Sequence, residues 1–214
     1  MRYLSKLEKS YENKKLEIKK RLEDFKKVWD KSDKDIFVEL CFCLLTPMTR
    51  AKTADEAVNR LLKENLLFVG NKTQIFKELR DVGIRFPDNK AKFIVEARDF
   101  FTQNEKIDIK NKLKQGTSNS KREWLVKNVK GLGYKEASHF LRNIGLGFDL
   151  AILDRHIMKN LLKYRVIKET PKCLTKKCYL SFENKMKEFS KKINIPMTDL
   201  DLLFWSEETG EIFK

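Results

Sequence analysis

One stretch of this 214-residue chain constrains its fold more than any other. The residues from Ile36 to Leu45 are apolar nearly all the way round a helix. Ser32 or Asp33 can cap the start of this helix, and Pro47 ends the apolar run. A helix without a polar face is stable in water only when other elements surround it. We therefore predict a buried central helix.

The rest of the chain repeats the helical spacing. From Leu4 to Trp29, apolar side chains recur every three, four or seven residues with lysines on the opposite face, which predicts a long amphipathic helix. No alternating pattern with a hairpin turn indicates a strand, so we predict an all-α fold. Further helices are expected at roughly 50–63, 72–81, 88–103, 119–129, 135–144, 154–163, 175–192 and 198–206.

The charge of the chain points to a polyanionic partner. Lysine and arginine outnumber aspartate and glutamate by 46 to 31, giving a net charge of +15. The partner is either nucleic acid or an anionic membrane surface. The basic residues are spread along the whole chain, which favours nucleic acid. No apolar run approaches a membrane span or a secretion signal, so we expect no membrane segment and a cytoplasmic protein.

The four cysteines predict neither a disulfide scaffold nor a metal site. Cys41 and Cys43 lie inside the apolar run and are typical of core packing. Cys173 and Cys178 lie in a lysine-rich segment, and two separated pairs with only two histidines lack the clustering that zinc needs. We predict no bound metal at these residues.

A glycine turn between two predicted helices is the first feature that carries chemistry. Gly131 and Gly133 stand one residue apart, and Lys135 opens the helix that follows. Glycines there allow positive φ and leave room for a phosphate to reach the backbone amides at a helix N-terminus. Such turns also cap helices for purely structural reasons, so the turn alone is weak evidence for nucleic-acid binding.

Nineteen residues after Lys135, an apolar approach delivers a carboxylate. The residues from Leu150 to Leu153 are apolar, and Asp154 follows them at the expected start of a helix, with His156 two residues later. As an N-cap, Asp154 would stabilise that helix by about 1 kcal/mol. The same residue can serve as both cap and catalyst.

Taken together, these residues resemble the helix-hairpin-helix superfamily of base-excision glycosylases. In that superfamily a lysine opening the second hairpin helix faces an aspartate about this far downstream. The chain from about Glu39 onward is similar to the archaeal-type 8-oxoguanine DNA glycosylase family. The stretches that carry the resemblance are Lys135–Asn143, Asp149–His156 and a tail that holds Trp205 and the terminal Lys214.

The resemblance implies a bifunctional enzyme, a DNA glycosylase with AP lyase activity that excises 8-oxoguanine. Lys135 would be the amine nucleophile, which attacks only when neutral, so a desolvating cleft is expected around it. Asp154 would stabilise positive charge that develops on the sugar. Gly131, Gly133 and His156 would contact DNA phosphates.

The resemblance also implies how the damaged base is held. A flipped base is usually stacked between flat side chains and hydrogen-bonded on its edges. Trp205 and Lys214 match the family's stacking tryptophan and discriminating C-terminal lysine, and Phe86 is a second stacking candidate. Without the resemblance, Trp205 is typical of a core residue and Lys214 of a frayed end. Asp201 either accepts a hydrogen bond from the base or lies on a solvated helix face.

Several expectations follow for the architecture and for bound species. We predict a central lobe over 31–130, a second lobe formed by 1–30 with 135–214, and a helix-hairpin-helix motif over 119–144 at their junction. The predicted partner is double-stranded DNA containing 8-oxoguanine, bound by a monomer. No cofactor is required, and Cys173 with Cys178 cannot hold the iron-sulfur cluster of some relatives. Whether a monovalent cation binds the hairpin carbonyls is left open.

Three questions remain open on the sequence alone. The lysine and aspartate define the reaction type better than the substrate, so a glycosylase for another oxidised base is an alternative. A non-catalytic protein that uses the hairpin to clamp DNA is a second. The turn from Thr46 to Arg50 lies where many superfamily members carry an amide side chain that fills the gap left by the flipped base. No amide is present there, so the residue that fills the gap is not identified.

Overall fold

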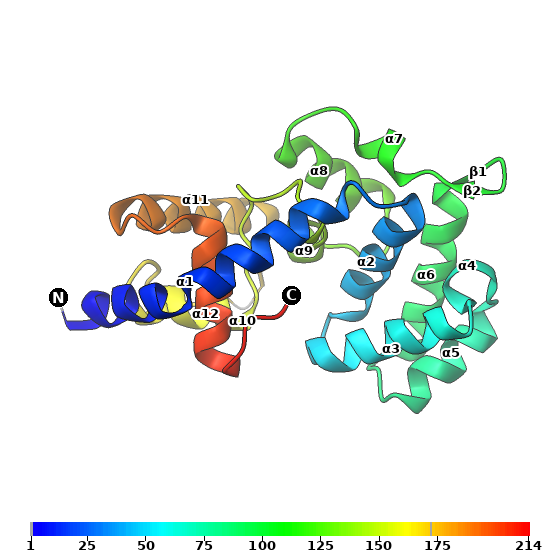
Figure 1. Cartoon of the computed structure of the whole chain (residues 1–214), viewed down its shortest axis with the longest axis horizontal. Coiled ribbons are helices and arrows are strands. Elements are labelled where there is room, and N and C mark those ends of the chain that lie inside the picture. Colours follow the sequence, from blue (N-terminus) through cyan, green and yellow to red (C-terminus); the bar gives the residue numbers. More distant parts are fainter. Residues whose placement is uncertain (1, 172) are drawn as a thin grey trace.

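The structure, a computed structural model that describes residues 2–171 and 173–214, is built almost entirely of helices (Figure 1), which confirms the predicted all-α fold. In the described residues no helix is long and apolar enough to cross a membrane. The helices are α1 Arg2–Val28, α2 Asp33–Leu45, α3 Ala51–Lys63, α4 Leu66–Val69, α5 Lys72–Asp81, α6 Pro87–Phe101, α7 Ile109–Leu113, α8 Ser118–Asn128, α9 Tyr134–Asn143, α10 Arg155–Lys163, α11 Lys176–Lys192 and α12 Met197–Thr209.

The apolar helix predicted from Ile36 to Leu45 is α2, and most of its side chains are buried. Ser32 caps it, because the Ser32 hydroxyl accepts the amide N–H of Asp35 while the Asp35 carboxylate accepts that of Ser32. Asp33, the other capping candidate, binds the start of α7. Its carboxylate accepts the amides of Ile109 and Lys110 at 2.7 and 2.8 Å and so holds the start of α7 against the central helix.

Buried apolar side chains form two clusters. One surrounds α2 and runs from Ile36 to Leu150, and the other joins α1 to the segment from Ala151 to Phe204. Figure 1 shows the corresponding arrangement, with α2–α6 at one end, α1 and α10–α12 at the other, and α9 between them. The α9 helix places most of its buried apolar side chains in the first cluster. The lobe boundaries at 31, 130 and 135 stay a prediction.

A two-stranded hairpin contradicts the sequence analysis, and the short helices α4 and α7 were not predicted. The helix expected over 88–103 ends at Phe101, and the chain forms a small antiparallel hairpin of β1 Thr102–Gln103 and β2 Lys106–Ile107. The two turn residues, Asn104 and Glu105, both have positive φ, as the tight turns of such hairpins require. The pattern was missed because the usual glycine is absent from the turn and each strand is only two residues long.

Candidate active site

The glycine turn joins α8 to α9, and its two glycines differ. Gly131 has φ +90, and a Cβ there would lie 2.6 Å from the Phe93 ring, so only glycine fits. Gly133 is extended, with φ −89, so the expectation of positive φ is confirmed at Gly131 and wrong at Gly133. The amide N–H of Gly133 donates to the Glu136 carboxylate at 3.2 Å. A phosphate reaching this amide would have to displace Glu136.

Lys135 lies in the first turn of α9, at the junction of the two clusters. Its side chain is 24% exposed, and its ammonium forms a 3.2 Å ion pair with the carboxylate of Glu136. Glu136 therefore contacts both the hairpin backbone and the lysine. The lysine is partly desolvated yet still open to a cavity, which is what an amine nucleophile needs.

Asp154 is the N-cap of α10, as predicted. One carboxylate oxygen, Oδ1, accepts the amides of His156 and Ile157, each at 2.8 Å. The segment that leads to it is held from behind by α11, because the Tyr179 hydroxyl donates to the carbonyl of Ala151 at 2.6 Å and accepts the amide of Leu153 at 3.3 Å. The cap thus holds the carboxylate, and α11 holds the backbone that leads to it.

A buried ion pair ties the hairpin to this approach. Arg122 of α8 donates two hydrogen bonds to Glu183 of α11, at 2.7 and 3.1 Å, and the two side chains are only 1% and 2% exposed. Arg122 also donates to the Ser138 hydroxyl of α9, and Glu183 accepts the Ala151 amide at 2.8 Å. The pair therefore connects the helix that carries Lys135 with the segment that presents Asp154.

A cavity of about 970 Å³ brings the predicted catalytic residues together with three of the four predicted base-recognition residues. It is bounded by the start of α9, the start of α10, the end of α12, the C-terminus and the turn between α2 and α3. Six of the residues singled out in the sequence line it: Lys135, Asp154, His156, Asp201, Trp205 and Lys214. Gly131, Gly133 and Phe86 are not among the residues that line it.

Asp201 is buried, so the alternative that it lies on a solvated helix face is wrong. Its side chain lines the cavity, with Arg142 Nη2 3.6 Å from its carboxylate. Burial raises the pKa of Asp201 to about 7, Arg142 opposes this, and the negative charge of Asp154 adds to it. Asp201 is therefore an acid that exchanges its proton near neutral pH beside the predicted catalytic carboxylate.

This pKa predicts how stability depends on pH. The folded state keeps the Asp201 proton between its ordinary pKa of 3.8 and about 7, where the unfolded state has lost it. The stabilisation of the folded state by this proton is therefore complete below pH 4 and disappears as the pH rises toward 7. We expect Asp201→Asn to raise the free energy of unfolding at pH 8 by up to about 4 kcal/mol relative to wild type. At pH 4 the two proteins should match. Urea unfolding at both pH values measures this, and the same difference at both would contradict the assignment.

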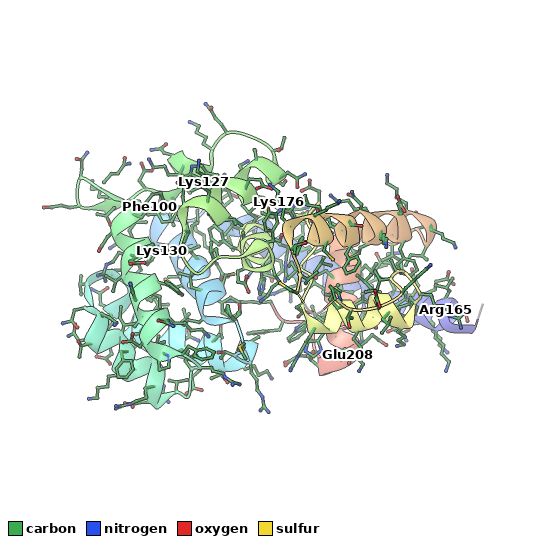
Figure 2. The ribbon with its side chains drawn as sticks, turned by 180° about the vertical axis from the view of Figure 1, so that it is seen from behind. Phe100, Lys127, Lys130, Arg165, Lys176 and Glu208 are labelled. Atoms are coloured by element: carbon green, nitrogen blue, oxygen red, sulfur yellow. The ribbon has the colours of Figure 1, made fainter. Side chains whose placement is uncertain are left out.

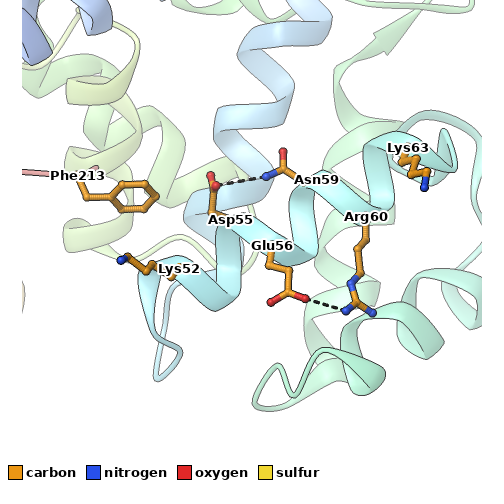
Figure 3. Close-up of a pocket in the computed structure, with 7 residues that line it drawn as sticks. All are labelled: Lys52, Asp55, Glu56, Asn59, Arg60, Lys63 and Phe213. Carbon is orange, nitrogen blue, oxygen red and sulfur yellow. Dashed lines mark hydrogen bonds and ion pairs between the residues drawn. The ribbon is translucent and has the colours of Figure 1, made fainter.

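The C-terminal tail is fixed, so the interpretation of Lys214 as a frayed end is wrong. Its ammonium pairs with Glu39 and Asp55 at 3.2 and 3.1 Å and lies 4.5 Å from the centre of the Phe42 ring. Burial lowers the pKa of Lys214, but the two carboxylates outweigh it and the pKa is raised. Figure 3 shows the neighbouring Phe213 across a groove from α3, which carries Asp55. The tail thus reaches from α12 to the first cluster.

Comparison with known proteins places the chain and its fold in a family. The model of the family described as 8-oxoguanine DNA glycosylase matches residues 18–195. A Fusobacterium nucleatum protein named 8-oxoguanine DNA glycosylase/AP lyase is 45% identical over 99% of this chain and 98% of its own length. The chain belongs to the 8-oxoguanine DNA glycosylase family.

Solved structures agree with this family assignment. The crystal structure of a Methanocaldococcus jannaschii 8-oxoguanine glycosylase/lyase, in complex with DNA containing 8-oxoguanine, is 35% identical, covers all of both chains and superposes with a TM-score of 0.91. The 8-oxoguanine DNA glycosylase of Thermotoga maritima is 34% identical, with a TM-score of 0.87 over 100% of this chain and 99% of that one.

Within this glycosylase fold, two predicted residues lie at the edge of the site. Phe86 precedes α6 with φ +56, a conformation that is uncommon for a bulky residue, and its side chain is 53% exposed. The adjacent Arg85 lines the cavity. His156 lines the cavity and accepts a 3.2 Å hydrogen bond from Arg155. The stacking role of Phe86 and the phosphate role of His156 stay predictions.

Sequence reasoning missed three residues near Lys135. His139 and Arg142 follow it on the same face of α9, at four- and seven-residue spacing, and both line the cavity. That spacing was a signal that could have found them. Burial and the nearby charge of Arg142 lower the pKa of His139 well below its usual value, so this imidazole is neutral. The third residue, Lys90, left no signal in a chain with so many lysines.

Proposed function

We propose that this chain is a DNA glycosylase and AP lyase that removes 8-oxoguanine from double-stranded DNA and then cleaves the strand. The observation that carries the proposal is the convergence of Lys135 and Asp154 on one cavity, although they come from different helices. The names of its relatives support the substrate and both reactions. The hairpin and the net charge of +15 support DNA as the partner.

In the proposed reaction Lys135 is the nucleophile. Its neutral amine attacks the anomeric carbon of the damaged nucleotide, the glycosidic bond breaks, and the base leaves with the bonding electrons and takes up a proton. The attached amine gives up one proton, and the sugar ring then opens as its ring oxygen takes up a proton, which leaves a Schiff base between the lysine nitrogen and the anomeric carbon. Removal of a proton from the neighbouring sugar carbon then expels the 3′ phosphate by β-elimination. Glu136 is paired to the Lys135 ammonium in the resting protein. It is therefore placed to accept the proton that this ammonium must lose before the amine can attack.

Asp154 acts as a fixed charge in this scheme. Because the cap hydrogen bonds hold its Oδ1, the carboxylate is oriented before substrate arrives. An oriented carboxylate stabilises the positive charge that develops on the sugar as the base leaves. Asp201, whose pKa is raised to about 7, donates to or accepts from the edge of the base according to its protonation state.

The surroundings of the cavity serve the DNA and the base. Trp205 and Phe86 stack on the extruded base, Lys214 helps to discriminate it, and the Gly131–Gly133 turn and His156 contact phosphates. Figure 2 shows three further lysines near the hairpin, Lys127 on α8, Lys130 in the turn after it and Lys176 on α11. Lys130 pairs with Glu96 at 3.3 Å and Lys176 with Glu123 at 2.8 Å, so these two would have to exchange a carboxylate for a phosphate to contact DNA. The chain works as a cytoplasmic monomer without a cofactor, and a monovalent cation on the hairpin carbonyls stays a prediction.

Borohydride trapping tests the proposed function. Borohydride reduces a Schiff base to a stable amine, so it links the enzyme covalently to any DNA on which the intermediate forms. Wild-type protein should give an adduct with a duplex that carries 8-oxoguanine and with one that carries an abasic site, and none with unmodified guanine. An adduct only at the abasic site would mean that the substrate is another base. No adduct with either would favour the non-catalytic DNA clamp.

The substitution Asp154→Asn distinguishes the role of Asp154 as a helix cap from its role as a negative charge. Asparagine caps helices as well as aspartate does, so the free energy of unfolding should change by less than about 1 kcal/mol. Removal of the carboxylate should slow base release about a hundredfold, because a fixed charge beside the developing cation is lost. Single-turnover excision and urea unfolding measure the two effects. A variant that is as active as wild type would show that Asp154 is a cap alone.

A further inference from the structure

The turn between α2 and α3 is the feature that the proposed function leaves unexplained. Residues 46–50 line the cavity, and Met48 stands at the tip of this turn with 67% of its side chain exposed. Its φ is +54, a left-handed conformation that is unfavourable for a residue with a Cβ. Such a conformation persists only where the surroundings enforce it. An exposed apolar side chain in an enforced conformation beside a charged cavity calls for an explanation.

Lys90 of α6 binds the chain on both sides of Met48. Its side chain is 4% exposed, and its ammonium donates to the carbonyls of Leu45 and Pro47 at 2.8 and 2.7 Å and to the hydroxyl of Thr49 at 2.9 Å. An ammonium group has three hydrogens, so the last residue of α2 and this turn together use them all. Two of the three acceptors flank Met48 directly.

The cost of burying this lysine indicates that its position matters. Buried ammonium groups are rare unless they are fully hydrogen-bonded. Burial, followed by the positive charge of Lys135, lowers the pKa of Lys90 to about 8. The charged form of Lys90 therefore binds the turn even though burial and the nearby charge of Lys135 both disfavour it. A turn that served only to connect two helices would not need such a contact.

We propose that Lys90 is a positioning residue that holds the 46–50 turn as a rigid wedge, and that Met48 at its tip enters the duplex when the damaged nucleotide leaves it. This inference rests on the proposed function. Apolar side chains, methionine among them, are used to part stacked bases, and a base leaves the helix at the cost of its stacking and pairing. A wedge held in shape before binding loses no conformational freedom when it enters. Arg50 and Arg85, which also line the cavity, place positive charge beside the wedge, where the phosphates would pass.

The test uses a duplex with a tetrahydrofuran residue, a stable abasic analogue, and the fluorescent base 2-aminopurine beside it. A side chain that enters the stack separates 2-aminopurine from its neighbour and raises its fluorescence. Saturating wild-type protein should give a several-fold rise, and Met48→Ala should give little or none. Leu16→Ala, which truncates a side chain that is 87% exposed on α1, is the matched control and should behave as wild type. A full rise with Met48→Ala would overturn the wedge.

Lys90→Met keeps the length of the side chain and removes its hydrogen bonds, and it should lose the fluorescence rise as Met48→Ala does. Thr49→Val, which removes a single acceptor, should lose part of it and serves if the first variant does not fold. The exposed Lys92 on the same helix gives the control Lys92→Met. A full rise with Lys90→Met, or with Thr49→Val where that variant stands in, would overturn the positioning role.

Excision kinetics add a readout that loss of fold alone would not produce. For both Met48→Ala and Lys90→Met, single-turnover excision of 8-oxoguanine paired with cytosine should slow about tenfold. Excision opposite a tetrahydrofuran residue, where no pair has to be broken, should change little. An equal loss on both duplexes would mean that these residues act on the chemistry instead. The fluorescence measurement needs no excision, so a wrong substrate in the proposed function would leave it unchanged.

Discussion

Replacing Lys135 with glutamine is expected to slow release of 8-oxoguanine about a thousandfold or more and to abolish the covalent adduct. Glutamine has nearly the same length and fits the first turn of α9, but its amide is not a nucleophile. The fold should survive, because the only ion pair of Lys135 among the described residues is with the neighbouring Glu136. Single-turnover excision and borohydride trapping measure the loss.

The control for this variant is a lysine with the same change and no place in the site. Lys106, exposed on β2, meets this condition, and Lys106→Gln should retain full activity. Lys135→Gln should still bind DNA with an abasic site, since the hairpin turn and the cavity remain. Residual lyase activity near the wild-type level would show that a different amine forms the Schiff base.

Loss of the buried ion pair is expected to have the largest effect on stability. Arg122→Met removes the buried partner of the Glu183 carboxylate and leaves it only the longer, 3.5 Å ion pair with the more exposed Lys187, so the cost should approach the roughly 3–5 kcal/mol of an unpaired buried charge. The free energy of unfolding, measured with urea, should fall by that amount. Because Glu183 also accepts the Ala151 amide, the approach to Asp154 should loosen and activity should fall as well.

A second substitution distinguishes the lost charge from lost packing. Glu183→Gln removes the negative charge and keeps an acceptor for the Ala151 amide. The double variant Arg122→Met with Glu183→Gln should therefore recover part of the stability that Arg122→Met alone loses. If the double variant is less stable than the single variant by the full cost of a second mutation, the two residues do not act as a pair.

Local signals explain how far the fold could be predicted from the sequence. The apolar spacing of α1 and α2 and the caps at Ser32 and Asp154 act within a few residues of themselves, so their helices begin where expected. The two-stranded hairpin was missed because its turn is Asn104–Glu105. The short helix α7 depends on Asp33, which lies 76 residues from the first amide it binds, and no local pattern contains that contact.

The same distinction between local signals and long-range contacts explains which residues of the site could be predicted. Lys135 and Asp154 could be predicted because the glycine turn and the apolar approach beside them resemble the corresponding stretches of a known family. The burial of Asp201, the ion pairs of Lys214 with Glu39 and Asp55, and the contacts of Lys90 depend on side chains from distant helices. The acceptors of Lys90 lie 41 to 45 residues before it. The residues next to Lys90 in the sequence therefore do not distinguish it from an exposed lysine.

The measurement that tests the central assignment most directly is the position of the covalent link. Wild-type protein trapped by borohydride on DNA with 8-oxoguanine can be digested, and the peptide that carries the sugar remnant identified by mass spectrometry. We predict that the remnant lies on Lys135 alone. A remnant on the N-terminal amine, on Lys90 or on any other lysine would contradict the assignment of Lys135 as the nucleophile.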